Sequence, residues 1–136
     1  MANTLYELGR QKFADGLISW TGDNIKVALV DSAVYTINLV TDEFITDVTA
    51  GGAVIATSSN LTSTANVFGV CDAADVTLSS VTGAVSEYLV CYKDTGTPAT
   101  SPLIGVIDSA TGLPVTPNGG DISIQWDNGA NKIFKL

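Results

Sequence analysis

Apolar side chains occur in short stretches along this chain, and most stretches are bounded by turn-forming residues, a pattern typical of β-strands. Two stretches stand out, residues 86–93 and 103–108, because both are rich in β-branched and aromatic side chains. The residues between them, at 94–98, are turn formers. We therefore expect two antiparallel strands at the centre of a β-sheet, with the other strands built around them.

The first of these central strands has two apolar faces. Because side chains alternate along a strand, Leu89 and Cys91 share one face, whereas Tyr88, Val90 and Tyr92 share the other. Neither face suits contact with water, so both are expected to be covered. An opposing sheet would cover one face, and the N-terminal helix or a second subunit would cover the other.

Further short strands are expected along the rest of the chain, at 25–30, 53–57, 66–70, 76–81, 122–126 and 132–136. Residues 127–131 predict the turn of a closing hairpin that joins the last two strands. Alternation directs Ile122, Ile124 and Trp126 inward. The chain therefore predicts a mainly β fold, an antiparallel β-sandwich or barrel of about seven or eight short strands.

The N-terminal segment predicts an amphipathic helix. Thr4 and Glu7 have the spacing of a capping box, and Gly16 supplies a stop. Gly9 lies in the middle of the apolar face, where it costs about 1 kcal/mol of helix propensity, so we expect a neighbouring backbone to approach it closely. The apolar face of this helix comprises Leu5, Tyr6, Leu8, Phe13 and Leu17.

Residues 1–18 thus form a helical arm, and residues 19–136 form the β-sandwich or barrel, within one domain overall. The arm has two interpretations: it covers one end of its own β-domain, or it docks on a neighbouring subunit. A second, short helix is expected at 40–45, where Thr41 is the N-cap and Val40 packs against Ile45.

Composition and charge narrow the function classes. A chain of 136 residues, 46% hydrophobic and 15% charged, suits one globular domain whose surface is partly covered by a partner. The net charge is −8 and Arg10 is the only arginine, so no nucleic-acid partner is expected. The sequence shows no signal peptide and no apolar run of the about 18 residues that cross a membrane. We expect a protein made in the cytoplasm, with no membrane partner.

Candidate chemistry is sparse. Histidine is absent, and no hydrolase or phosphate-binding motif occurs. Cys71 and Cys91 lie in apolar segments without zinc or redox spacing, so we expect both to be buried and reduced rather than joined in a disulfide. Asp72 and Asp75 could offer oxygens to a hard cation, but without a calcium-loop pattern they are interpreted as solvated carboxylates. The sequence predicts no enzyme, no cofactor and no metal site.

The candidate functional residues are therefore those of a protein interface. Trp126 fits a core position, whereas Trp20, in a turn directly after the arm, is the better candidate for a partner contact. The apolar face of the arm and the two tyrosines of the central strand complete the set. The candidate interface residues are Leu5, Tyr6, Leu8, Gly9, Phe13, Leu17, Trp20, Tyr88 and Tyr92.

The chain contains LYELGRQKF at 5–13, KVALVD at 26–31, YKDTG at 92–96, DSATGLPV at 108–115 and WDNG at 126–129. These segments resemble a group of small virion proteins of tailed bacteriophages, and the resemblance spans nearly the whole chain. It implies a virion component, most plausibly a capsid decoration (cement) protein. Such proteins bind the major capsid protein on the outside of the shell as dimers or trimers. The resemblance implies no catalytic residues.

Other functions fit the same pattern. One alternative is a tail, neck or baseplate protein, which would also be a virion component but would belong to another part of the particle. A carbohydrate-binding β-sandwich would need exposed aromatic residues on one face, and Tyr88 and Tyr92 share a face of the central strand.

Overall fold

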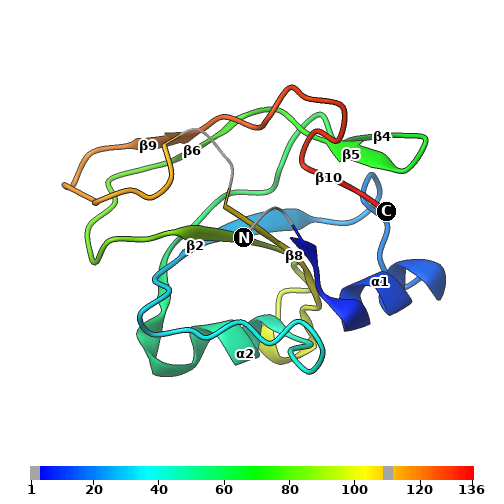
Figure 1. Ribbon diagram of the computed structural model, residues 1–136, viewed down its shortest axis with the longest axis horizontal. Coiled ribbons are helices and arrows are strands. Elements are labelled where there is room, and N and C mark those ends of the chain that lie inside the picture. The colour runs from blue at the N-terminus through cyan, green and yellow to red at the C-terminus, as the bar shows by residue number, and fades with distance from the viewer. Residues whose placement is uncertain (1–3, 109–111) are drawn as a thin grey trace.

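The computed structural model describes residues 4–108 and 112–136, so part of the turn-rich link expected after Asp108 and the start of the arm lie outside the described residues. The fold is mainly β and antiparallel, as the sequence predicts (Figure 1). In sheet order, the five-stranded sheet consists of β1 (Thr4–Leu5), β8 (Leu103–Ile107), β7 (Tyr88–Lys93), β2 (Ile25–Val30) and β3 (Val54–Thr57). The three-stranded sheet consists of β10 (Phe134–Lys135), β5 (Val70–Asp72) and β4 (Ala65–Val67), and the two-stranded sheet of β6 (Val76–Leu78) and β9 (Ile122–Ile124).

The two central strands of the sequence prediction are confirmed as β7 and β8. They pair antiparallel, with Leu89 opposite Ile107 and Val90 opposite Val106. β7 is the middle strand of the five-stranded sheet, between β8 and β2. The apolar stretch with no polar face therefore occupies the place in the sheet where both strand edges and both faces are covered.

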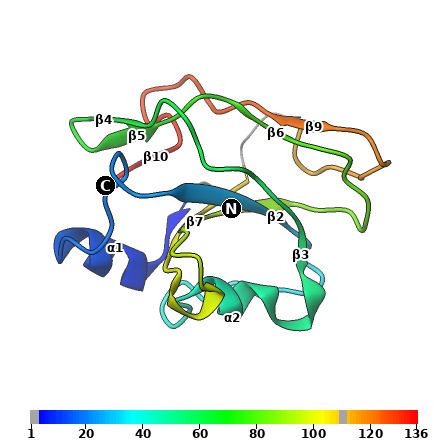
Figure 2. The ribbon, with the colours of Figure 1, turned by 180° about the vertical axis from the view of Figure 1, so that it is seen from behind.

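The five-stranded sheet is the middle of three layers (Figures 1 and 2). The two small sheets cover one face, where Leu89 and Cys91 share a core with Trp126. The connection that contains α2 (Ile45–Thr49) covers the other face, where Val90 packs in a second core with Val48. Burial of both faces is thus confirmed, but α2 of the same chain forms the third layer, rather than the N-terminal helix or a second subunit.

The N-terminal helix, α1 (Glu7–Ala14), is shorter than expected, and the capping box at Thr4 is wrong. Thr4 lies in β1 instead, opposite Val106 of β8, because the edge of the central sheet offers its backbone a partner. The close approach at Gly9 is confirmed, since a Cβ atom there would lie 2.6 Å from the carbonyl oxygen of Leu103. α1 therefore packs against β8 of its own chain.

The second helix begins later than predicted. Residues 40–44 are not helical, so only Ile45 of the predicted helix lies in α2. α2 is followed by a 3₁₀ turn, Ala50–Gly52, and a further 3₁₀ turn spans Pro98–Thr100. The Oδ2 atom of Asp47 accepts hydrogen bonds from the backbone N–H groups of Glu43 at 2.8 Å and Phe44 at 3.0 Å. This carboxylate, and not Thr41, satisfies the free donors at the start of the helix.

Two strand predictions near the small sheets are wrong. The segment 66–70 is not one strand, because β4 and β5 form a hairpin with its turn at Phe68 and Gly69. The closing hairpin does not form either: β9 pairs with β6, and β10 pairs with β5. The last two strands thus lie in different sheets, although Ile124 and Trp126 are buried as alternation predicts.

A chain of hydrogen bonds crosses the core beneath the central sheet. The hydroxyl groups of Tyr6 and Tyr35 lie 2.7 Å apart, and the Tyr35 hydroxyl donates to Asp42 Oδ2 at 2.5 Å. Tyr6 is fully buried. Burial raises the pKa values of both phenols, and the Asp42 carboxylate adds to this effect at Tyr35. Both hydroxyl groups therefore remain protonated donors.

Tyr35→Phe should destabilise the chain more than Tyr6→Phe. Removing the Tyr35 hydroxyl leaves the buried Tyr6 hydroxyl without a partner, which costs about 1–3 kcal/mol of unfolding free energy. Removing the Tyr6 hydroxyl preserves the bond from Tyr35 to Asp42 and should cost about 1 kcal/mol. Urea unfolding of both variants and of the double variant checks this order, and the double variant should lose less than the sum. If Tyr6→Phe destabilised the chain more than Tyr35→Phe, the hydrogen bonds would not run from Tyr6 through Tyr35 to Asp42.

Candidate functional site

An open groove of about 610 Å³ lies between α1 and the three-stranded sheet, at one end of the molecule. Figure 1 shows α1, β4, β5 and β10 together at this end. Its apolar lining includes Phe13 and Ala14 from α1, Ile18 and Trp20 from the following turn, and Leu136 after β10. Its volume lies within the roughly 300–1,000 Å³ range of pockets that enclose a ligand or an anchor side chain.

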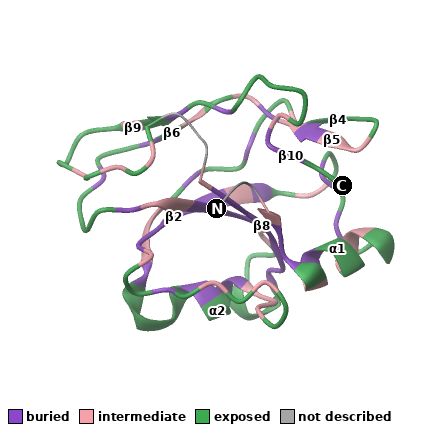
Figure 3. Cartoon of the chain, in the orientation of Figure 1, coloured by how far each residue is buried: buried purple, intermediate pink, exposed green. Residues whose placement is uncertain are grey.

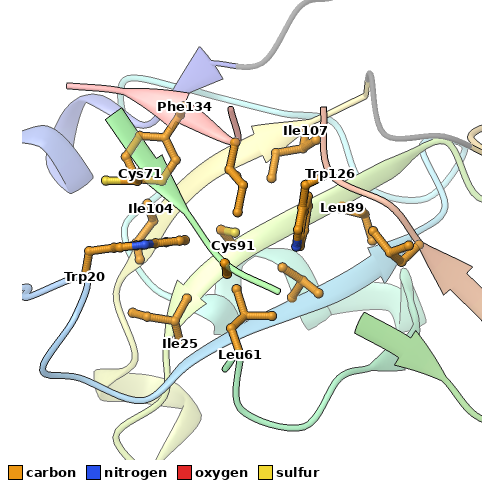
Figure 4. Close-up of a cluster of buried hydrophobic side chains, with 14 of the residues drawn as sticks. Trp20, Ile25, Leu61, Cys71, Leu89, Cys91, Ile104, Ile107, Trp126 and Phe134 are labelled. Atoms are coloured by element: carbon orange, nitrogen blue, oxygen red, sulfur yellow. The ribbon is translucent and has the colours of Figure 1, made fainter. Parts of the chain in front are cut away.

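Trp20 forms the base of this groove. Its side chain is only 3% exposed, and its Nε1–H donates to the carbonyl oxygen of Asp72 at 2.9 Å. The indole meets the Phe134 ring edge-on, with centroids 5.0 Å apart, and Figure 4 shows both rings in the buried cluster between the sheets. Trp20 thus fixes the residues that follow α1 onto the three-stranded sheet.

Phe68 projects at the tip of the hairpin beside the groove. Val67 pairs with Val70, so the loop contains two residues, Phe68 and Gly69. Both have positive φ, 52° and 81°, as in the type I′ turn of a tight hairpin. The Phe68 side chain is 96% exposed, the highest value among the large hydrophobic residues in the described part of the chain.

Exposed apolar side chains gather at this end. Four large hydrophobic residues with more than half of their surface exposed lie on or beside the groove: Leu17, Val67, Phe68 and Leu136. We call these four residues, together with the groove, the apolar end. Figure 3 shows that the outer side of α1 and strand β4 are largely exposed, whereas β5 is buried or intermediate. Exposed apolar side chains that gather at one end of a molecule make that end a candidate interaction site.

The groove carries a cation at its rim and no acid in its lining. Arg10 lines the groove and has no carboxylate partner among the described residues. Three lysines elsewhere are paired, in the contacts Lys12–Glu43 at 2.6 Å, Lys26–Asp94 at 2.8 Å and Lys93–Asp23 at 3.2 Å. Arg10 therefore gives the apolar end a cation without a carboxylate partner among the described residues, in a chain of net charge −8.

The structure divides the candidate interface residues into three groups. Leu5, Tyr6, Gly9, Trp20 and Tyr92 are buried within the chain; Leu8, Phe13 and Tyr88 are partly buried; Leu17 is exposed. Phe13 and Trp20 line the groove, and Leu17 lies between the lining residues Gly16 and Ile18. Tyr88 and Tyr92 belong to the second core, on the α2 side of the central sheet. Trp20 packs in the core of its own chain and therefore has almost no exposed surface for a partner.

Sequence reasoning missed Phe68, Arg10 and Leu136. The signal for Phe68 was the Phe-Gly pair between two valines, since glycine after an exposed position is a mark of a two-residue hairpin. No local signal brings Arg10 and Leu136 to one groove, because they are far apart in the chain and meet only in the tertiary structure.

Cys71 and Cys91 are free and buried, as expected from the sequence. Burial raises the pKa of Cys71 to about 11 and raises that of Cys91 further. Both thiols should therefore react slowly with a thiol reagent at pH 8 in the folded chain and rapidly in denaturant, because the thiolate is the nucleophile. Labelling followed against pH should modify Cys71 first, and Cys91→Ser serves to assign the signal. Fast labelling of the folded chain at pH 8 would contradict this placement.

Of the two carboxylates considered for a cation, that of Asp75 makes a structural contact. Asp75 Oδ1 accepts from the backbone N–H of Trp126 at 3.0 Å, and the Asp72 carbonyl accepts from Trp20. Within residues 4–108 and 112–136, no group of three or more acidic or cysteine side chains is placed to hold a metal ion. The described residues at this end of the molecule thus offer an apolar groove with exposed apolar side chains beside it.

No protein-family model matches this chain, and no curated protein sequence matches it. None of the helices in the described ranges has the length and hydropathy needed to span a bilayer.

Proposed function

We propose that this chain is a non-enzymatic structural protein of a tailed-bacteriophage virion. Its role is that of a capsid decoration (cement) protein, which is made in the host cytoplasm and binds the shell of the major capsid protein. The resemblance of segments spread over the chain to small virion proteins supports the virion assignment. The observation that carries an adhesive role is the apolar end, where Phe68 is 96% exposed beside a groove of about 610 Å³.

The fold suits a protein that acts by binding. Two cores, one on each face of the central sheet, give a rigid body that does not depend on a partner for its own packing. A rigid scaffold with a projecting apolar side chain binds with little loss of conformational freedom. Many copies of such a body can therefore bind to equivalent positions on a lattice without a change in their own packing.

The number of copies per particle tests this proposal. Quantitative mass spectrometry of virions from the phage that encodes the chain should find hundreds of copies, in proportion to the major capsid protein. Purified chain should also co-sediment with empty shells of that phage. A handful of copies per particle would assign the chain to the tail, neck or baseplate, and absence from purified particles would overturn the virion assignment.

The carbohydrate-binding alternative has less support. Such modules bind sugars on exposed aromatic platforms, but Tyr92 is 8% exposed and Tyr88 is partly buried against the second core. Phe68 is the one fully exposed aromatic residue in the described part of the chain. Retention on immobilised polysaccharide without shell binding would favour that alternative.

A further inference from the structure

We infer that Phe68 is an anchor that inserts into the groove of a second copy of this chain, so that two copies pair reciprocally through their apolar ends. This pairing is a property of the isolated chain and is independent of the proposed place in a virion. Three observations support it: the conformation of Phe68, the apolar area at this end, and the charge of the groove.

The backbone at Phe68 favours a different residue. A φ of 52° lies in the left-handed region, which a bulky side chain adopts only at an energetic cost, and the first loop position of a type I′ turn favours asparagine. Phe68 gains nothing from its own chain in return, because its side chain is 96% exposed. A strained residue with a fully exposed aromatic side chain indicates a function outside the folded monomer.

The area at the apolar end suits a dimer of this chain. Leu17, Val67, Phe68 and Leu136 expose on the order of 450 Å² together, if a full aromatic side chain contributes about 200 Å². This is over half of the about 800 Å² that each partner buries in a standard interface. The groove walls, which include Phe13 and Ala14, add to this area when Phe68 of the partner enters.

Symmetry and charge favour a second copy as the occupant. The projecting Phe68 and the groove lie side by side on one end, so a twofold axis between two such ends satisfies both grooves at once. The lining of the groove contains no acidic residue, although the chain carries a net charge of −8. Two such ends can therefore meet without carboxylates of the two linings facing each other.

Phe68→Asn separates the role of this residue as an anchor between copies from its effect on the stability of the hairpin turn. We expect the wild-type chain to dimerise in sedimentation velocity and the variant to have a dimer Kd raised by about a hundredfold or more, as for loss of a central anchor. At dilutions where the wild-type chain is monomeric, the variant should unfold at a higher urea concentration, because asparagine suits the turn. Val85→Ser, which alters a 44% exposed valine outside the groove lining, should leave the Kd unchanged.

The groove is tested by its own variant and by crosslinking. Ala14→Glu places an acidic side chain in the groove from an exposed helical position and should also abolish the dimer. A photoreactive phenylalanine analogue at 68 should crosslink to groove residues such as Phe13 of a second copy, whereas the analogue at 85 should give no dimer. A wild-type chain that stays monomeric, a dimer that survives both Phe68→Asn and Ala14→Glu, or a closed trimer would overturn the reciprocal pair.

Discussion

Gly9→Ala is expected to lower the free energy of unfolding by about 3 kcal/mol, at the upper end of the range for overpacked cores. A Cβ atom at this position would lie 2.6 Å from the carbonyl oxygen of Leu103 and 3.1 Å from that of Ile104. Both are backbone atoms of β8, a buried strand, so no side chain can move to relieve the contact. Either α1 shifts away from the sheet or the β1–β8 pairing is disturbed.

Helix propensity predicts the opposite sign, which makes this result decisive. In a helix interior alanine is more stable than glycine by about 1 kcal/mol. At Gln11, which is exposed in the same helix, the alanine variant should therefore be more stable than the glycine variant by about this amount. Urea unfolding of all three variants checks both signs. If Gly9→Ala stabilised the chain, the close packing of α1 on β8 would be wrong.

Trp20→Ala is expected to destabilise the chain by about 3–5 kcal/mol, the usual cost of removing a large buried aromatic side chain. The substitution removes the edge-on contact with Phe134 and leaves the carbonyl oxygen of Asp72 without its indole donor. It also removes the base of the groove. Thermal or urea unfolding should show a large loss of stability in the isolated chain, before any partner is added.

Leu17→Ala is the matched control for Trp20. Leu17 was a candidate interface residue on the same grounds, but its side chain is 56% exposed. Its truncation should change the unfolding free energy by less than about 0.5 kcal/mol. If dimerisation uses the apolar end, the same variant should weaken the dimer. If the Trp20→Ala chain were as stable as the wild-type chain, the original interpretation of Trp20 as a partner contact would be favoured again.

The local sequence pattern was sufficient to predict elements whose contacts are close in sequence or whose side chains alternate with a simple period. The apolar run without a polar face predicted the central place of β7, and Ile25–Val30 was found with its correct bounds. The glycine on the apolar face of α1 predicted the close backbone contact that the structure contains. In each case the side-chain pattern reports directly on burial, and burial is the dominant free-energy term.

Local pattern failed where partners compete over long distances. The turn at 127–131 predicted that the last two strands would pair, but β6 and β5 provide edges for β9 and β10 instead. Thr4 has the spacing of a helix cap, yet pairing with β8 satisfies its backbone better. An unpaired strand edge readily pairs with another strand, and the local sequence pattern does not show where such an edge lies.

The amino-acid pattern alone predicts a mainly β, antiparallel protein with a central strand buried on both faces. It does so because hydrophobic periodicity and turn chemistry act over a few residues. The folded chain was needed to show that α2 covers the second face and that Trp20 belongs to the core. It was also needed to show that Phe68 is exposed beside a groove lined by residues from both ends of the chain. The physical reason is that a docking surface consists of residues left over after the core is satisfied, and only the folded chain shows which residues these are.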